Sequence, residues 1–129
     1  DESNLDVAFD SSTGFRLPNG AIRSPDAAWV RLDRWQALTS EQRKKFVPLC
    51  PDFVVELASP SDEVEDIREK MQEYLANGLQ LGWLIAPATQ TVEIYRPNQP
   101  IEILNQPATL SGENILPEFV LNLTGILTD

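Results

Sequence analysis

Residues 51–86 read PDFVVELASPSDEVEDIREKMQEYLANGLQLGWLIA and predict a strand, a helix and a second strand in succession. The first strand is expected over 52–58, because this stretch is short, rich in β-branched residues and bounded by Pro51 and Pro60. Successive side chains of a strand point to opposite faces. We therefore expect one face to carry Phe53, Val55 and Leu57 and the other to carry Asp52, Val54, Glu56 and Ala58.

The helix is expected over 61–77. Its first residues are serine and acids, which suit the positive N-terminal end of a helix, and Gly78 is a favourable stop. Apolar residues recur at helical spacing and predict one buried face made of Val64, Ile67, Met71, Tyr74 and Leu75.

Outward from this unit, the sequence alternates short apolar runs with turn signals. The turn RLPNGA (16–21) is expected to join a strand at 5–9 to a second strand around 21–30. Short helices are expected over 32–38 and 40–46, the latter with Ser40 as N-cap. Further strands are expected at 82–86, 91–96 and 101–104, and Pro117 separates two short apolar pieces after them. This order predicts an α/β (mixed α+β) fold around one sheet.

The composition bounds the class of protein. With 129 residues, 42% of them hydrophobic, residues 1–129 are expected to form one domain with one core. Lys and Arg number 10 against 20 Asp and Glu, a formal net charge of -10, which disfavours a general nucleic-acid binder and attraction to an anionic membrane. The chain has neither an apolar run long enough to span a membrane nor a secretory signal, and its lone Cys50 suits a reducing compartment, so a cytoplasmic location is expected.

The chain contains no histidine, which removes histidine-based acid–base catalysis, Ser-His-Asp triads and histidine zinc sites. A metal site in this chain would have to use oxygen ligands. Oxygen donors favour Mg²⁺ or Mn²⁺ over Zn²⁺.

Glu56 is the first candidate site residue, because it lies inside the most hydrophobic strand. A buried carboxylate costs several kcal/mol unless it is paired or bound to a metal. The alternatives are a solvated face or a simple pair with Lys or Arg. Asp52 lies on the same face but ~13 Å away along the strand, so it cannot share one small cation with Glu56.

Asp26 and Lys70 are the other two candidates. Asp26, in SPDAAWV (24–30), directly precedes an apolar strand and is the best second carboxylate for Glu56, although Pro-Asp is also a common turn pair. Lys70 lies on the border of the apolar helix face, from which its amine could reach a carboxylate. Its alternative is a solvent-exposed pair with Asp66, worth only ~0.3–0.5 kcal/mol.

Together the three residues permit one chemistry. Two carboxylates would hold Mg²⁺, and a lysine beside the metal would orient or deprotonate a water for phosphodiester hydrolysis.

The segments SPDAAWV, residues 51–85 and TVEIYRP (91–97) resemble the Uma-type restriction endonuclease family of the PD-(D/E)XK nuclease superfamily, over roughly residues 13–125. The resemblance implies a restriction-endonuclease-like core, a central mixed sheet flanked by helices. It also implies a metal-dependent nuclease that uses Mg²⁺ or Mn²⁺. The implied metal ligands are Asp26, Glu56 and the backbone carbonyl of Leu57, the implied catalytic lysine is Lys70, and the implied supporting residues are Asp66 and Tyr74.

The chain also departs from the family pattern. The superfamily lysine normally stands two residues after the acid, where this chain has Ala58, and relatives carry an acid where this chain has Ala86. Relatives further carry an N-terminal helix and strand, an additional acid and a histidine, which are expected to be missing here. This part is either trimmed from the given sequence or truly lost; if it is lost, the site is expected to be incomplete and the enzyme inactive.

Two functions follow from these observations. The first is a nuclease acting on DNA or RNA, for which seven basic residues among the first 45 could form a local strip despite the acidic balance, unless they form an ordinary solvated surface. The second is a non-catalytic module that keeps the fold and forms a homodimer through exposed apolar residues. The expected contacts are Trp29, Trp35 and Leu49, although tryptophans more often belong to the core.

Overall fold

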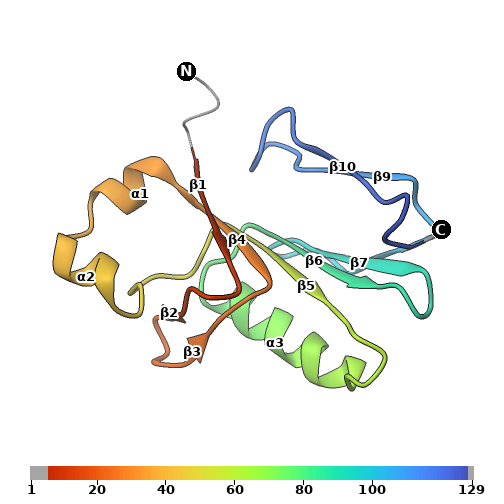
Figure 1. Ribbon diagram of the computed structural model, residues 1–129, viewed down its shortest axis with the longest axis horizontal. Coiled ribbons are helices and arrows are strands. Elements are labelled where there is room, and N and C mark those ends of the chain that lie inside the picture. The colour runs from red at the N-terminus through yellow and green to blue at the C-terminus, as the bar shows by residue number, and fades with distance from the viewer. Residues whose placement is uncertain (1–5, 128–129) are drawn as a thin grey trace.

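The computed structural model describes residues 6–127 and is built around a six-stranded sheet in the order β1-β4-β5-β6-β7-β8 (Figure 1). Neighbouring strands run antiparallel except for the central pair β5 and β6, which are parallel. The strands are β1 (Asp6–Asp10), β4 (Ala27–Arg31), β5 (Phe53–Leu57), β6 (Leu81–Ala86), β7 (Thr91–Tyr95) and β8 (Glu102–Asn105). The expected mixed α+β class with a central mixed sheet is therefore confirmed.

Different elements cover the two faces of the sheet. Helix α3 (Val64–Ala76) connects β5 to β6 and lies across one face, whereas the strand pair β9 (Thr109–Ser111) and β10 (Val120–Asn122) lies over the other (Figure 1). The short helices α1 (Leu32–Gln36) and α2 (Ser40–Lys44) and the hairpin of β2 (Phe15–Arg16) and β3 (Ile22–Arg23) gather at the β1 and β4 end of the sheet. Helices thus flank one face and one end, and strands close the second face.

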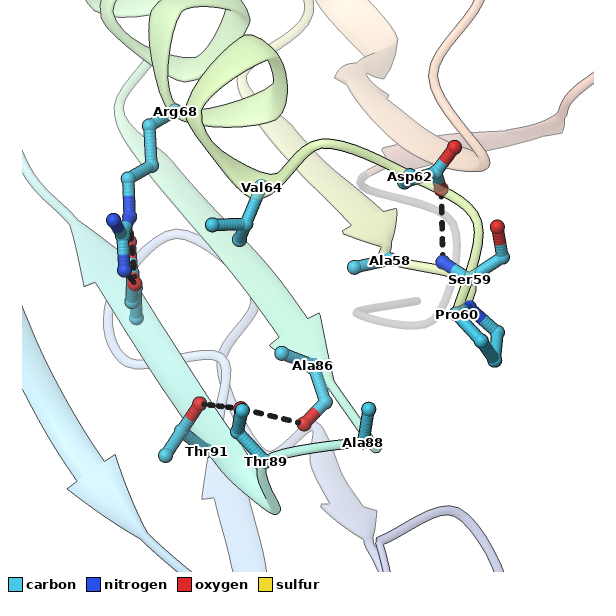
Figure 2. A pocket seen from close by; sticks show the side chains of 11 residues that line it. Ala58, Ser59, Pro60, Asp62, Val64, Arg68, Ala86, Ala88, Thr89 and Thr91 are labelled. Carbon is cyan, nitrogen blue, oxygen red and sulfur yellow. Dashed lines mark hydrogen bonds and ion pairs between the residues drawn. The ribbon is translucent and has the colours of Figure 1, made fainter.

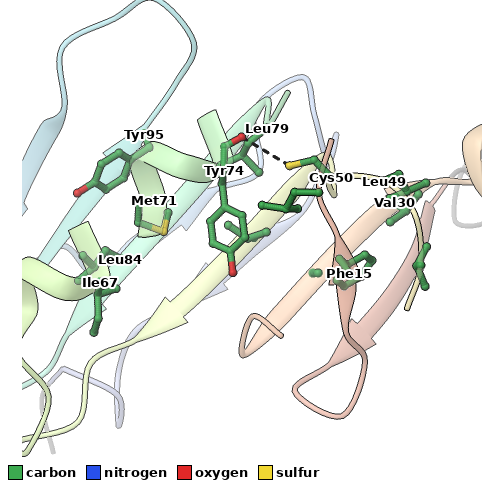
Figure 3. Packing of buried hydrophobic residues seen from close by; sticks show 14 of the residues in the cluster. Phe15, Val30, Leu49, Cys50, Ile67, Met71, Tyr74, Leu79, Leu84 and Tyr95 are labelled. Carbon is green, nitrogen blue, oxygen red and sulfur yellow. Dashed lines mark hydrogen bonds between the residues drawn. The ribbon is translucent and has the colours of Figure 1, made fainter. Parts of the chain in front are cut away.

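The core is divided by the sheet, and strand β5 contributes to both halves. Its alternation is as predicted: Val54 packs under α3, while Phe53 belongs to the cluster on the opposite side. Figure 3 shows the α3 side, where the buried helix residues Ile67, Met71 and Tyr74 meet the sheet. The thiol of Cys50 donates a 3.5 Å hydrogen bond to the Tyr74 carbonyl, and burial raises the pKa of that thiol to about 12. The single cysteine is therefore a core residue.

Two local predictions need correction. The turn at Pro18–Gly20 joins β2 to β3, two strands of two residues each, because Leu17 and Ala21 close a tight hairpin; these strands are too short to show alternation. The N-cap of α2 is Thr39, not Ser40, since Thr39 and Gln42 form a reciprocal capping box. The first residue of the strand expected at 5–9 lies outside the described residues.

The long helix also begins later than expected, at Val64. Residues 59–62 form a turn instead of a helical start. The Asp62 carboxylate accepts the Ser59 amide proton at 2.8 Å, and the Asp62 amide donates to the Ser59 carbonyl at 3.0 Å. The short polar side chains therefore fold back on their own backbone, as such residues often do outside helices.

The apolar residues expected at a dimer surface are mostly engaged within the chain. Leu49 is buried at 8% exposure, so the expectation that it is exposed is wrong. Trp29 stacks on Phe53 with ring centroids 4.9 Å apart, and Trp35 packs on Phe9. Within residues 6–127, no helix is both long and apolar enough to cross a membrane.

The close approach of α3 to β6 generates a prediction. A Cβ atom on Gly82 would lie 2.5 Å from the terminal methyl of Met71 and 2.8 Å from a methyl of Leu79, both of which are fully buried. Gly82→Ala is expected to lower the free energy of unfolding by about 1–3 kcal/mol, as overpacking does in other cores. Urea-induced unfolding measures this loss.

Gly14→Ala is the matched control, because a Cβ atom there would meet the ring of Phe46, which is 48% exposed and can swing away. An equal loss of stability in both variants would contradict the account of α3 packing.

Candidate active site

The carboxylate of Glu56 lies near the C-terminal end of β5, on the face covered by α3, and the residue is 5% exposed. Two side chains of α3 meet it. The Tyr74 hydroxyl donates a 2.8 Å hydrogen bond to Oε2, and the Lys70 ammonium lies 3.9 Å from the same oxygen. Lys70 and Tyr74 are four residues apart on the helix, so both project from one side of it towards β5.

Burial sets the protonation of this group. Removal from water raises the pKa of Glu56, while the Lys70 charge and the Tyr74 hydrogen bond act in the opposite direction, and the nearby Asp26 charge raises the pKa further. Burial and the Glu56 charge likewise raise the pKa of Tyr74, which therefore keeps its proton and remains a donor. The site is a desolvated carboxylate that would gain from a further positive charge.

Asp26 joins Glu56 from the neighbouring strand. Strand β4 pairs antiparallel with β5, and the register Ala27 to Val55 brings the residue before Ala27 next to the residue after Val55. The Asp26 carboxylate accepts the Leu57 amide proton at 2.7 Å. Asp26 is exposed whereas Glu56 is buried, so the two carboxylates give this end of the sheet one open and one sheltered acid.

The donor set suits a small divalent cation. The Tyr74 hydrogen bond goes to Glu56 Oε2 and the Leu57 hydrogen bond goes to Asp26 Oδ2, so these two bonds do not use Glu56 Oε1 or Asp26 Oδ1. The part of the chain between Asp6 and Leu127 contains no group of three His, Cys, Asp or Glu side chains that could hold a metal. Mg²⁺ is commonly bound through only one or two carboxylates and retains several waters, so two acids and a carbonyl fit its needs.

Two other acids considered in the sequence, Asp66 and Asp52, lie outside the group around Glu56. Asp66 is exposed one turn before Lys70, and its side chain makes no contact with Glu56 among the described hydrogen bonds and ion pairs. Asp52 directly precedes β5, at the end of the strand away from Glu56, where it accepts the Arg31 amide proton at 2.8 Å and pairs with Arg34 at 2.9 Å. The structure thus brings Asp26, Glu56, Leu57, Lys70 and Tyr74 together and leaves Asp66 and Asp52 apart.

A second buried carboxylate, Glu93, escaped the sequence analysis although it carries the same signal as Glu56, an acid inside an apolar strand. It lies on β7 at 4% exposure and accepts hydrogen bonds from Arg68 of α3 at 2.6–3.1 Å and from the Tyr95 hydroxyl at 2.7 Å. Burial opposes its ionisation, but the bonds from Arg68 and Tyr95 outweigh burial and lower the pKa of Glu93. Because this acid is already paired with a cation, it stabilises the fold and is not a metal candidate.

A pocket of about 200 Å³ lies next to the C-terminal end of β5, and its lining includes Glu93 but not Glu56 (Figure 2). Its walls are the loop after β5, the first turns of α3 and the ends of β6 and β7, and Arg68 and Glu93 close one side. Ala58, also in the lining, is two residues beyond Glu56 on the same strand face, a separation of about 7 Å. The small side chains Ala58 and Ala86 keep this space open beside the candidate site.

Comparisons with known proteins agree with this fold. A family model described as "Uma2: Putative restriction endonuclease" matches residues 1–124. The crystal structure of a "putative nuclease belonging to DUF820" from Anabaena variabilis is similar to the chain with a TM-score of 0.79 and 23% sequence identity, covering 97% of this chain and 69% of that one. None of the curated proteins compared with the sequence matches it. The family model carries the description of a restriction endonuclease, and the structural neighbour has the same fold.

The Glu93 pair generates a pH-dependent prediction. Because the folded state lowers the pKa of Glu93 below its ordinary 4.5, ionised Glu93 adds stability above that value, and the contribution disappears as pH falls through the folded pKa. Glu93→Gln is expected to lower the free energy of unfolding by about 1–3 kcal/mol at neutral pH. The difference from the wild type should shrink as pH falls below 4.5, as measured by urea unfolding across pH.

Glu65→Gln is the control, since Glu65 pairs with the same Arg68 but its side chain is 74% exposed. Its removal should change stability by less than about 1 kcal/mol at any pH. A Glu93→Gln deficit that stays constant with pH would contradict the assignment.

Proposed function

The chain belongs to the Uma2 family, and from this membership we propose that it is a metal-dependent nuclease that hydrolyses phosphodiester bonds of nucleic acid at Asp26, Glu56 and Lys70. The observation that carries the proposal is the surroundings of Glu56: a desolvated carboxylate with an ammonium 3.9 Å away and a second carboxylate on the next strand. A core carboxylate serving only stability would be expected to have its own full ion pair, as Glu93 has.

Asp26 and Glu56, with the backbone carbonyl of Leu57, would hold Mg²⁺ or Mn²⁺. When bound, such a metal supplies positive charge for the scissile phosphate and for a water. Leu57 is 48% exposed, so the main chain at this position lies close to the surface where a substrate would arrive. The Asp26 hydrogen bond to the Leu57 amide fixes this main chain against β4.

Lys70 would act on the attacking water and on the phosphate. Its side chain is 37% exposed and therefore reaches both Glu56 and solvent. In hydrolysis, a water oxygen forms a bond to phosphorus, the bond from phosphorus to the leaving ester oxygen breaks, and the water's proton passes to solvent while the leaving oxygen gains one. An ammonium at this point orients the water and offsets the charge that develops on the phosphate oxygens.

Tyr74 would be a positioning residue. Its hydroxyl holds Glu56 Oε2, and its ring is fully buried between helix and sheet, so Glu56 Oε1 is left to turn towards a ligand. Within residues 6–127, the Asp66 side chain makes no hydrogen bond or ion pair with Glu56, Lys70 or Tyr74, so we assign it no positioning role.

The test is nuclease activity of the purified protein with Mg²⁺ or Mn²⁺ on single-stranded and duplex DNA and RNA. Glu56→Gln, Asp26→Asn and Lys70→Met are each expected to reduce the cleavage rate at least about 100-fold, because each removes charge from the reacting centre. Asp52→Asn is the matched control, because this buried acid directly precedes β5 and lies at the end of the strand away from Glu56.

Metal binding supplies a second readout. Electron paramagnetic resonance of added Mn²⁺ should detect weaker binding in Glu56→Gln and Asp26→Asn but not in Asp52→Asn. Mn²⁺ binding that is as tight in all three variants as in the wild type would contradict the proposed metal site. Nuclease activity that survives Glu56→Gln would contradict it as well. Folded wild-type protein that binds Mn²⁺ but cuts none of the four substrates would leave a non-catalytic module with the nuclease fold.

A further inference from the structure

The ten basic residues of the chain divide into two groups. Six of them pair with carboxylates: Arg23, Arg31, Arg34, Arg68, Lys70 and Arg96. The other four form no ion pair with any residue between Asp6 and Leu127; they are Arg16, Arg43, Lys44 and Lys45. In a chain with 20 acidic residues, four cations without an ion pair among the described residues are unusual, although Glu41 lines a neighbouring hollow with Arg16, Lys45 and Phe46.

These four cations lie together. All four line one hollow of about 600 Å³, with Ser12, Thr13, Gly14 and Phe46, and we name this surface the cationic hollow. Two backbone contacts assemble it from distant segments. The Arg16 amide donates to the Val47 carbonyl at 2.8 Å, and the Val47 amide donates to the Gly14 carbonyl at 2.9 Å. The end of α2 is thereby fastened beside β2.

The hollow also contains an aromatic ring next to a fixed guanidinium. Phe46 is 48% exposed and lies over Gly14, where a Cβ atom would come within 2.7 Å of the ring. Arg43 is held by two hydrogen bonds to the Trp35 carbonyl, at 3.0 and 3.2 Å, and its guanidinium lies 5.1 Å from the centre of the Trp35 ring. Cations around an accessible ring are the combination that binds unpaired nucleotides, through phosphate contacts and base stacking.

One wall of the cationic hollow lies close to the segment that precedes Asp26. A Cβ atom on Gly14 would lie 3.4 Å from the Ser24 hydroxyl, and Ser24 is two residues before Asp26. Two residues of extended chain span at most about 7 Å. A strand seated in the hollow therefore needs to continue only a short distance to reach Asp26.

We propose that the cationic hollow binds the phosphate backbone of a single-stranded nucleic-acid segment, with Phe46 stacked on one of its bases, and directs that segment towards Asp26. The choice of nucleic acid as occupant rests on the proposed function. The same cations could also bind the headgroups of an anionic membrane. The proximity of Asp26 favours a nucleic-acid segment, and the net charge of -10 disfavours a broad anionic surface, which would contact more of the protein than the hollow.

Binding is tested without cleavage, by fluorescence anisotropy of a labelled oligothymidylate in EDTA between about 50 and 200 mM salt. Lys44→Gln/Lys45→Gln is expected to weaken binding at least about tenfold at the lower salt. It should also reduce the slope of log affinity against log salt by about 1.4, the loss of two phosphate contacts on a single strand. Phe46→Ala is expected to weaken binding at least about fivefold without changing that slope.

Arg16→Gln and Arg31→Gln form a matched pair, because both arginines are exposed but only Arg31 has an acidic partner, Asp33 at 3.5 Å. Arg16→Gln should weaken binding and Arg31→Gln should not. Equal losses of oligonucleotide affinity in Arg16→Gln and Arg31→Gln, or an unchanged affinity in Phe46→Ala, would overturn the proposal. So would tighter binding to a duplex of the same length, or cosedimentation with phosphatidylserine vesicles in place of oligonucleotide binding.

The two proposals fail separately. Glu56→Gln should bind the oligonucleotide like the wild type because it lies outside the cationic hollow. If hollow-dependent binding is found without cleavage, the proposed function fails and the binding surface stands. If the wild type cleaves nucleic acid and the Lys44→Gln/Lys45→Gln variant cleaves and binds equally well, the surface is wrong and the nuclease stands.

Discussion

The burial of Glu56 beneath helix α3 is the constraint on which the rest of the structure depends. A carboxylate on a covered sheet face must be met by donors, and α3 supplies Tyr74 and Lys70 one turn apart. The other flank of the same helix repeats this arrangement with Arg68 and Glu93. The helix therefore spans from β5 to β7 with a polar contact at each side. Glu93 has a fully engaged cation, whereas Glu56 has a hydroxyl and a more distant ammonium, and this difference separates a structural acid from a candidate catalytic one.

The sheet order explains why two acids far apart in the sequence meet. Strand β5 has β4 on one side and β6 on the other, and α3 connects β5 to β6. Asp26 reaches this point from the neighbouring strand β4, and Lys70 and Tyr74 reach it from the sheet face that α3 covers. All of them meet at the C-terminal end of β5, where Leu57 leaves the core and becomes exposed. Ligands of open sheets that contain parallel strands commonly bind at such ends.

Much of this arrangement could be predicted from the sequence, because it follows from alternation and helical spacing. The two faces of β5, the buried face of α3 and the exclusion of Asp52 as a partner of Glu56 depend only on strand and helix geometry. The hairpin of β2 and β3 and the cap at Thr39 could not be found in this way, since backbone hydrogen bonds and not side-chain periodicity form them. The acid Glu93 could have been found from its place in an apolar strand, but its pairing could not, because its cation lies 25 residues earlier on a different element. Which of the basic residues are left without acidic partners is likewise a tertiary property, and the net charge of -10 conceals it.

The central claim is that the end of β5 is a cation site formed by Asp26 and Glu56. A crystal structure of the protein soaked in Mn²⁺, with anomalous scattering recorded, tests it most directly. The account predicts an anomalous peak within coordination distance of both carboxylates, at about 2.0–2.4 Å from an oxygen of each. A peak elsewhere, or none at this point while Glu56 keeps its contacts to Tyr74 and Lys70, would contradict it.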